Sequence, residues 1–349
     1  MGAEMCIRDS YIYELVRKGK TQTGIVGCSS IDDYMNGVVK KHELTREDKE
    51  QDRIHHVDSC NANTGPIFLA CRYPDSLLTL MNNWKDHHEA AYDFTEEDQI
   101  THRVWVIDED EVISEINKEF AGIDSLYIAD GHHRAASAVK VGLKRREQNP
   151  GYTGEEEFNY FLSVVFPYDQ LCILPYNRIV KDLNGLTVKA FLGALKFNFE
   201  LMLMPGFPCK PVEKHCMGMY VDGQWYHLKA WPDIYEKKDV VGQLDVSILQ
   251  EKVLRPVLGI EDPRTDQRIS FVGGSHKAAE LAEIADRTGG VAFVMYPTSM
   301  EDLMKIADEN KLMPPKSTWF ESQSFGVGCL YISYNLPKMS YKNIIIISL

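Results

Sequence analysis

The chain has 349 residues, of which 44% are apolar and 26% are charged, and its 38 basic and 51 acidic side chains give a net charge of −13. This balance is that of a globular protein and excludes a disordered tail protein, a collagen-like fibre and a coiled coil. Non-specific duplex binding depends on surplus Lys and Arg, so the charge also argues against generic nucleic acid binding. At roughly 150 residues per domain, the length predicts about two domains.

The sequence predicts neither a secretory leader nor a membrane span. The first residues lack a basic segment followed by an apolar one. The apolar run at residues 344–347 is far shorter than the roughly 20 residues that cross a bilayer. The eight cysteines form no CxxC pair, which is typical of reduced thiols. We therefore expect a cytoplasmic protein with no membrane partner.

Strand and helix signals alternate in the first part of the chain, which we take as one lobe over residues 11–150. The predicted strands cover residues 21–28, 67–71, 104–106 and 126–129. The predicted helices cover residues 77–84, 112–120 and 135–143. Turn-forming residues at 149–151, followed by three glutamates, mark the expected domain boundary.

The second part of the chain predicts another mixed α/β lobe over residues 151–321. Asp222-Gly223 lies between two apolar runs, which is a strong signal for a hairpin with a type I′ turn. Strands are expected at residues 161–166, 269–272 and 291–295, and helices at 244–258, 278–285 and 300–307. The expected fold class is therefore α/β, or mixed α+β, with two lobes.

Both ends of the sequence have unusual composition. Residues 5–10 resemble a translated sequencing adapter, so we expect the first lobe to be truncated at its N-terminus. The composition changes abruptly after Glu321, and residues 322–349 have strong β-propensity and few charges. We interpret this stretch as an aberrant tail.

The strongest chemical signal is the run Asp130-Gly131-His132-His133-Arg134, where an apolar strand gives way to a helix of small residues. The amides at a helix N-terminus are unpaired donors, so this junction suits an anion. Gly131 permits close approach of the backbone to a ligand, and Arg134 can hold a phosphate with two hydrogen bonds. Asp130 can cap the helix or bind a phosphate-coordinated Mg²⁺. The alternative is a capped helix with solvated polar residues.

A second signal is a basic helix over residues 45–53. Thr45 and Asp48 have the spacing of an N-terminal capping signal. Arg46, Lys49 and Arg53 then lie on one face of the helix. The helix is either solvated, or its basic face lines a polar cleft.

Two further groups complete the candidate site. Glu43 lies among cations that include Lys41, where a carboxylate can act as a general base. Lys316 lies on a stiff loop with two prolines and hydroxyl donors.

Four motifs occur together in this order: the Lys-Lys-His-Glu-x-Thr-Arg block at residues 40–46, the Asn61-Ala62-Asn63-Thr64 turn, the Asp130–Arg134 run, and Met-Pro-Pro-Lys-Ser-Thr at residues 313–318. With these motifs the chain resembles, from about residue 11 to residue 321, a bacterial family catalogued as a domain of unknown function. Members of that family begin with a segment containing a Pro-Tyr-Asp-Val motif, which this chain lacks. Their Glu-Pro-Lys continuation is replaced here by Glu321-Ser322-Gln323.

The Asp-Gly-x-x-Arg turn also resembles the nucleotide-binding signature of the ParB and sulfiredoxin-like fold. Free-serine kinases of that fold transfer a phosphoryl group from a nucleotide to L-serine. This resemblance implies that the first lobe, residues 11–150, has the ParB and sulfiredoxin-like fold. It also implies that Gly131, His132, His133 and Arg134 hold phosphate and that Asp130 assists Mg²⁺.

The hypothesis from the sequence is a Mg²⁺-dependent phosphotransferase that uses ATP or ADP and acts on a small hydroxylated metabolite, with L-serine as one candidate. Its predicted catalytic residues are Glu43, Asp130 and His133. Its predicted phosphate-binding and nucleotide-binding residues are Gly131, His132, Arg134, Lys41, Arg46, Lys49, Arg53 and Lys316. One alternative is a nucleotide-binding switch without phosphotransfer. Another is a hydrolase with His132 and His133 as metal ligands, although neighbouring helical side chains point about 100° apart.

Overall fold

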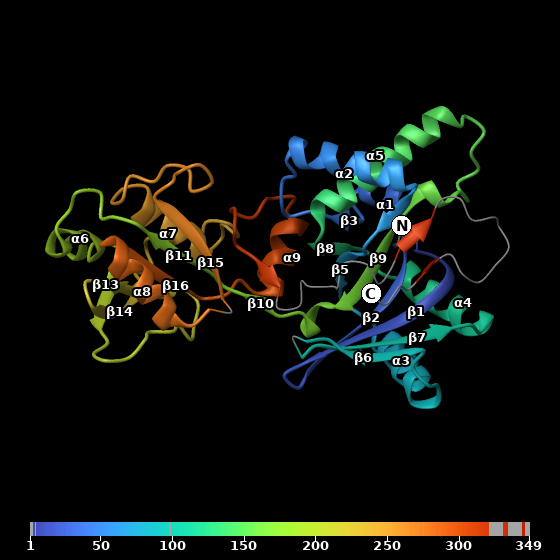
Figure 1. Cartoon of the computed structure of the whole chain (residues 1–349), viewed down its shortest axis with the longest axis horizontal. Helices are drawn as coiled ribbons and strands as arrows, with labels where there is room; N and C mark the ends of the chain where they lie inside the picture. The colour runs from blue at the N-terminus through green and yellow to red at the C-terminus, as the bar shows by residue number, and fades with distance from the viewer. Residues whose placement is uncertain are drawn as a thin grey trace. The chain divides into compact units, whose positions relative to one another are not determined.

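The structure is a computed structural model that describes residues 3, 5–97, 99–274, 276–320, 331–333 and 344–345. The chain divides into two compact units (Figure 1): Met1–Leu171 with Ser322–Leu349, and Cys172–Glu321. Both units combine strands and helices, so the expected mixed α/β class is confirmed. Among the described residues, no helix has the length and apolar character to cross a membrane.

The first unit is built around one eight-stranded sheet with the strand order β3-β8-β5-β9-β2-β1-β7-β6. Its strands are β1 (Met5–Arg17), β2 (Lys20–Ser30), β3 (Val39–Lys40), β5 (Ile67–Cys71), β6 (Tyr92–Thr95), β7 (Thr101–Ile107), β8 (Leu126–Asp130) and β9 (Tyr160–Pro167). Its helices are α1 (Ile31–Asn36), α2 (Glu47–Cys60), α3 (Asp75–His87), α4 (Asp110–Ala121) and α5 (His132–Gln148). The strands and helices expected for this part of the chain are all present.

The boundary between the units lies later in the chain than residue 150. Strand β9 is a central strand of the first sheet, because it pairs antiparallel with β2 and parallel with β5. Every residue from Phe161 to Pro167 is buried. The turn at residues 149–151 therefore separates α5 from β9 within one unit, and the division falls between Leu171 and Cys172.

Helices α3, α4 and α5 each contribute to the apolar core of the first unit. Leu77, Ile116 and Ala135 are fully buried in one cluster with strand residues such as Ile25 and Leu69. Helix α2 differs, because only Glu50 and Val57 are buried along its length. Figure 1 shows α2 beside α5, and the two helices are in contact. Polar contacts must therefore contribute much of what holds α2 in place.

The second unit contains a six-stranded antiparallel sheet with the order β12-β14-β13-β16-β11-β15. Its strands are β11 (Tyr176–Val180), β12 (Phe199–Leu203), β13 (Cys216–Val221), β14 (Gln224–Ala230), β15 (Ile269–Gly273) and β16 (Val291–Met295), with the short pair β10 (Ile173–Leu174) and β17 (Trp319–Phe320) forming a separate ladder. Its helices are α6 (Val188–Leu195), α7 (Asp245–Leu249), α8 (Ala278–Thr288) and α9 (Met300–Asp308).

The side-chain alternation of β16 shows how this sheet is covered on both faces. Phe293 packs in one apolar cluster with α6, α7 and α9, whereas Ala292 and Val294 pack in another with α8. This alternation is what a strand of period two gives. The hairpin expected at Asp222-Gly223 is confirmed, since both residues have positive φ and join paired strands β13 and β14.

The helix expected over residues 244–258 is shorter than predicted. Helix α7 ends at Leu249 and continues as one π-helical turn over Gln250–Leu254. The apolar pattern cannot distinguish the two forms, because both bury the same side chains, including Leu249 and Leu254.

The predicted aberrant tail lies largely outside the described residues. Within residues 322–349, the structure describes β18 (Tyr331–Ser333) and β19 (Ile344–Ile345). Strand β18 pairs antiparallel with β4 (Ala62–Thr64) and with β19.

Candidate functional site

The candidate site begins at the turn that connects β8 to α5. Strand β8 lies between β3 and β5 in the sheet and is buried from Leu126 to Ala129. Gly131 follows with φ of 98° and ψ of 26°, a left-handed conformation that favours glycine. The helix that starts at His132 has no side-chain cap on its first amides. The expected strand, turn and helix N-terminus are therefore present.

Arg134 folds back over this turn. Its Nη2 donates to Asp130 Oδ2 at 3.0 Å, and both side chains are about one third exposed. A Cβ on Gly131 would lie 3.0 Å from the same Nη2 atom, so the guanidinium rests directly on the glycine. Arg134 Nε is buried and has no hydrogen-bond partner among the residues that the structure describes. The ion pair with Asp130 holds the Arg134 guanidinium at the helix N-terminus and leaves its Nε–H donor available.

A small cavity beside Arg134 brings other predicted residues to the same place. It is lined by Arg134 of α5, by Arg53 of α2, and by the Asn63–Gly65 segment that follows α2. Thr64 Oγ1 is hydrogen-bonded to His56 Nε2 at 2.9 Å. The cavity volume is about 20 Å³, which is room for about one water molecule. A larger ligand does not fit this cavity in the conformation described.

His132 is not placed as we expected for a side chain that donates a hydrogen bond to a phosphate. Its ring is buried and meets the buried ring of His42 edge-on, with centroids 4.4 Å apart. Burial lowers the pKa of His42 to about 3 and lowers that of His132 well below its usual value, where the charges of His42, His133 and Lys41 also contribute. Both rings are therefore neutral near pH 7. The sequence contains no signal for this pair, because its members lie in different elements.

His133 connects α5 to the start of α2. Its Nε2 accepts a hydrogen bond from the backbone N–H of Arg46 at 3.1 Å. This hydrogen bond occupies Nε2 and joins the start of α5 to the segment that leads into α2. The catalytic role expected for His133 stays a prediction.

The N-terminus of α2 differs from the predicted capping arrangement. The helix begins at Glu47, and the Thr45 hydroxyl donates to the Glu50 carboxylate instead of capping the helix. Glu50 is buried and also accepts from Lys140 of α5. Burial raises the pKa of Glu50, but the hydrogen bonds from Lys140 and Thr45 outweigh it, so the net shift is downward. Thr45 is consumed by a tertiary contact, which short-range spacing does not reveal.

The predicted basic face of α2 is only partly available for a ligand. The Arg46 guanidinium pairs with Asp48 at 2.7 Å in an exposed position. Lys49 and Arg53 are exposed. Of these cations, Arg53 is the one that shares a cavity with Arg134.

The remaining predicted residues lie in three different settings. Glu43 is exposed in the loop between β3 and α2, and no hydrogen bond or ion pair of its side chain is found within the described part of the chain. Lys41 lies 4.5 Å from the centroid of the Tyr34 ring. Lys316 belongs to the second unit, where its Nζ lies 5.5 Å from the Tyr176 ring centroid.

A magnesium ion fits this site only as part of a nucleotide complex. Over the described ranges, no three His, Cys, Asp or Glu side chains are grouped so that they can hold a metal ion. Mg²⁺ is usually bound by one or two carboxylates together with substrate phosphates. Asp130 supplies one carboxylate at the helix N-terminus, which fits that arrangement. The same finding gives no support to a metal site formed by His132 and His133.

The fold and the turn define a mixed α/β protein with a candidate anion site at a strand-to-helix junction. The chain belongs to the family described as Protein of unknown function (DUF1015), whose sequence pattern matches residues 7–247. No curated protein matches the chain in sequence.

Several solved structures are similar to this chain. One is a variant of a free serine kinase in complex with AMP, with 14% identity over 85% of this chain and 87% of that chain and a TM-score of 0.42. Another is C-terminally truncated SbnI from Staphylococcus aureus, with 12% identity over 85% of this chain and 82% of that chain and a TM-score of 0.42. A third is a conserved hypothetical protein from Pyrococcus furiosus, with 16% identity over 87% and 92% and a TM-score of 0.36.

Proposed function

We propose that the protein is a Mg²⁺-dependent phosphotransferase that moves the terminal phosphoryl group of ATP or ADP to a small hydroxylated metabolite, with L-serine as the first acceptor to test. The observation that carries the proposal is the β8–α5 turn. Left-handed Gly131 precedes the uncapped first amides of α5, the Arg134 guanidinium lies against Gly131, and Arg134 and Arg53 line one cavity. This combination of unpaired amides and cations suits a phosphate group.

In this mechanism the nucleotide phosphates bind at the N-terminus of α5. A phosphate oxygen replaces the Asp130 carboxylate as the partner of Arg134, so the guanidinium leaves Gly131 and the small cavity opens. Asp130, released from Arg134, would hold Mg²⁺ that is carried by the nucleotide, and the ion would supply neutralisation of the phosphate charge. Arg53, which lines the same cavity as Arg134, adds a second positive charge.

The group that accepts the proton of the acceptor hydroxyl is proposed to be Glu43. The hydroxyl oxygen forms a bond to the terminal phosphorus, the bond to the leaving phosphate oxygen breaks, and the hydroxyl proton passes to the Glu43 carboxylate. Glu43 lies one residue after buried His42 and is itself exposed, so it is accessible to a substrate. The buried ring of His42, the residue before Glu43, packs against the buried ring of His132.

The proposal is tested by separating nucleotide binding from turnover. Arg134→Ala is expected to abolish nucleotide binding in calorimetry, because it removes the cation at the helix N-terminus. Glu43→Gln is expected to leave binding intact but to slow transfer of radiolabelled phosphate to L-serine or a metabolite pool by about a hundredfold or more, as is usual for a lost general base. Arg287→Ala, an exposed arginine on α8, is the matched control.

Two outcomes contradict the phosphotransferase. One is unchanged nucleotide affinity in Arg134→Ala, because that result would show that the nucleotide does not bind at the proposed site. The other is nucleotide binding without phosphoryl transfer to any small-molecule pool, because that result would show that the protein does not catalyse the proposed reaction.

The second candidate function is a nucleotide-binding switch without phosphotransfer. It is favoured by the lack of any described contact that orients Glu43, because a catalytic base is normally held in position. This alternative shares the Asp130–Arg134 site and predicts tight nucleotide binding with no effect of Glu43→Gln on any measured property.

A further inference from the structure

Arg178 is a buried arginine in the sheet of the second unit. It lies on β11, paired with Phe271 of β15 on one side and with Phe293 of β16 on the other. Its exposure is 3%, although arginine is rarely buried without a charged partner. The burial of this cation in a strand is therefore informative.

The guanidinium of Arg178 has no carboxylate partner among the described residues. It donates to the backbone carbonyl oxygens of Tyr176 and Lys316, the latter at 3.0 Å, and lies 5.4 Å from the Phe271 ring centroid. Two hydrogen bonds occupy fewer than half of its five N–H donors. Burial lowers the pKa of Arg178 to about 9, because the charged form is poorly solvated. A buried charge of this kind is costly unless an anion compensates it.

Arg178 lines a cavity of about 380 Å³ that lies entirely within the second unit. This volume is within the range of small-molecule sites. Apolar walls come from Phe271, Leu254 and Pro314. A cavity that combines apolar walls with one buried cation suits a ligand that has both an apolar body and an oxyanion.

The other arginines at this cavity are already neutralised. Arg255 pairs with Glu251 and with Glu261, and Arg264 pairs with Asp262 at 2.7 Å. These residues are mostly exposed. Arg178 is thus the one lining cation, among the described residues, that lacks an acidic partner.

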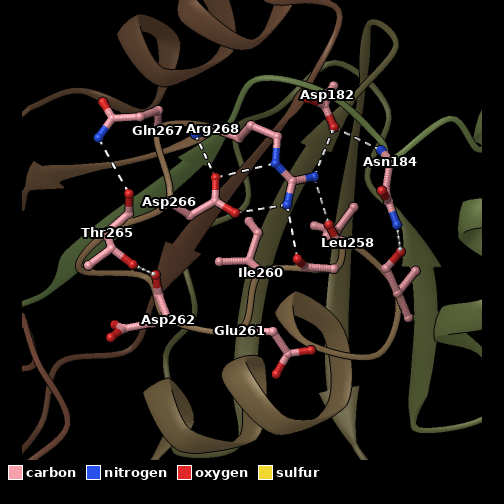
Figure 2. A network of polar contacts seen from close by, with 12 residues as sticks. Asp182, Asn184, Leu258, Ile260, Glu261, Asp262, Thr265, Asp266, Gln267 and Arg268 are labelled. Atoms are coloured by element: carbon pink, nitrogen blue, oxygen red, sulfur yellow. Dashed lines mark hydrogen bonds and ion pairs between the residues drawn. The ribbon is translucent and has the colours of Figure 1, made fainter.

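The loop that forms one wall of the cavity is held in place by Arg268. Figure 2 shows its guanidinium surrounded by acceptors: it donates to the Leu258 carbonyl at 2.9 Å and to Asp266 at 2.8 Å, and lies 3.5 Å from Asp182. Gln250, on the π-helical turn, donates to the Ile260 carbonyl at 2.9 Å. The wall is therefore fixed from both ends, and π-helical turns occur frequently at functional sites.

We propose that this Arg178 cavity binds a small organic anion, either a carboxylate or a phosphate monoester. The oxyanion bonds to the Arg178 guanidinium, and the apolar part of the ligand packs on Phe271 and Leu254. The site lies in the second unit and does not depend on the proposed phosphotransferase, which uses residues of the first.

The test is calorimetry of the full chain with phenyl phosphate and with benzoate, each compared with inorganic phosphate and with uncharged benzyl alcohol. We expect one of the two aromatic anions to bind at least about tenfold more tightly than inorganic phosphate and benzyl alcohol, because only it uses both the cation and the apolar walls. The arm that binds identifies the oxyanion as a phosphate or a carboxylate.

Two variants test the assignment to this cavity. Arg178→Lys loses the planar fork of donors and is expected to weaken binding about tenfold or more. Phe271→Ala, at a half-buried strand position, retains Arg178 and is expected to weaken binding of the aromatic anions but not of inorganic phosphate. Arg287→Lys, on exposed α8 surface, is the control and should bind as the parent chain does.

The proposal is overturned if neither aromatic anion binds the parent chain. It is also overturned if binding persists unchanged in Phe271→Ala, which tests the cavity even where Arg178→Lys fails to fold.

Discussion

Gly131 controls the candidate site at the scale of a single residue. Its φ of 98° is unfavourable for any residue with a Cβ, and a Cβ there would lie only 3.0–3.3 Å from three atoms of the Arg134 guanidinium. The backbone conformation and the placement of the cation therefore depend on the same missing methyl group. Asp130 completes the arrangement by pairing with Arg134.

Gly131→Ala is expected to reduce the free energy of unfolding by about 1–2 kcal/mol, the usual cost of a left-handed conformation, and to displace Arg134. Nucleotide affinity should fall as a result. Gly154→Ala is the matched control, because Gly154 also has positive φ, at 94°, but has open space around its missing Cβ. Chemical denaturation of both variants measures the cost of backbone strain, and calorimetry measures the effect on nucleotide binding. Equal nucleotide affinity in the two variants would contradict the role given to Gly131.

The predictability of the site follows from how far apart its residues are in sequence. The Asp130–Arg134 turn is visible because its strand, glycine and helix are consecutive. The cavity shared by Arg53 and Arg134 was not predictable, because it depends on how α2 packs on α5. The burial of His132 was missed for the same reason, and Arg178 gives no signal because a lone arginine in a strand resembles many others.

At the scale of elements, α2 is attached to α5 mainly by polar contacts. Glu50 accepts from Lys140, and its carbonyl accepts from Ser137 Oγ at 3.2 Å. Farther along, Asp58 pairs with Lys144 and with Arg145. Because α2 buries little apolar surface, these contacts set its position, and with it the position of Arg53.

Glu50→Gln is expected to destabilise the protein by about 1–3 kcal/mol at pH 7, because it removes the charge that pairs with Lys140 at a buried position. The folded-state pKa of Glu50 is lowered, so its contribution is present above the unfolded-state pKa of 4.5 and is lost as the pH falls through the folded-state value. The difference between parent and variant should therefore shrink in acid.

Hydrogen exchange locates this effect. Amides of α2 are expected to exchange faster in Glu50→Gln than in the parent chain, whereas those of α4 should not change. Asp48→Asn is the control, since the ion pair of Asp48 with Arg46 lies at the exposed start of the same helix. Equal exchange of α2 in parent and Glu50→Gln would show that the apolar contacts suffice.

Element prediction succeeded where the hydrophobic period was local and failed where tertiary contacts decide. The strands at residues 67–71 and 291–295 match β5 and β16 to the residue, because buried strands are continuous apolar runs. The start of α2 was wrong, since Thr45 bonds to Glu50. The boundary placed at residue 150 differs from the observed one, because a turn within a unit and a linker between units have the same composition.

At the scale of the whole molecule, each unit has its own sheet and its own apolar core. The cluster that contains Ile25 and Leu69 lies wholly within the first unit, and the cluster that contains Phe293 lies wholly within the second. Each eight- or six-stranded sheet is likewise confined to one unit. We therefore expect two separate cooperative unfolding transitions, one for each unit.

Asp245→Asn distinguishes these transitions, because Asp245 is a buried acid of the second unit. Its Oδ1 atom is buried and has no hydrogen-bond partner in the described part of the chain, and burial raises the pKa of Asp245 from 3.8 to about 7. Between these values the folded state holds more protons than the unfolded state, so the stability of the second unit falls as the pH rises from about 4 to 7. Asparagine does not ionise, and the variant should be more stable by about 1–4 kcal/mol above pH 7, with a gain that vanishes near pH 4.

Scanning calorimetry at pH 5 and pH 8 measures this effect. One transition should rise in temperature for Asp245→Asn at pH 8 while the other stays where it is in the parent chain. Asp233→Asn, an exposed acid of the same unit, should shift neither. If both transitions move together, the two units unfold as one. Such coupling would have to come from contacts other than the sheets and apolar clusters, which are confined to single units.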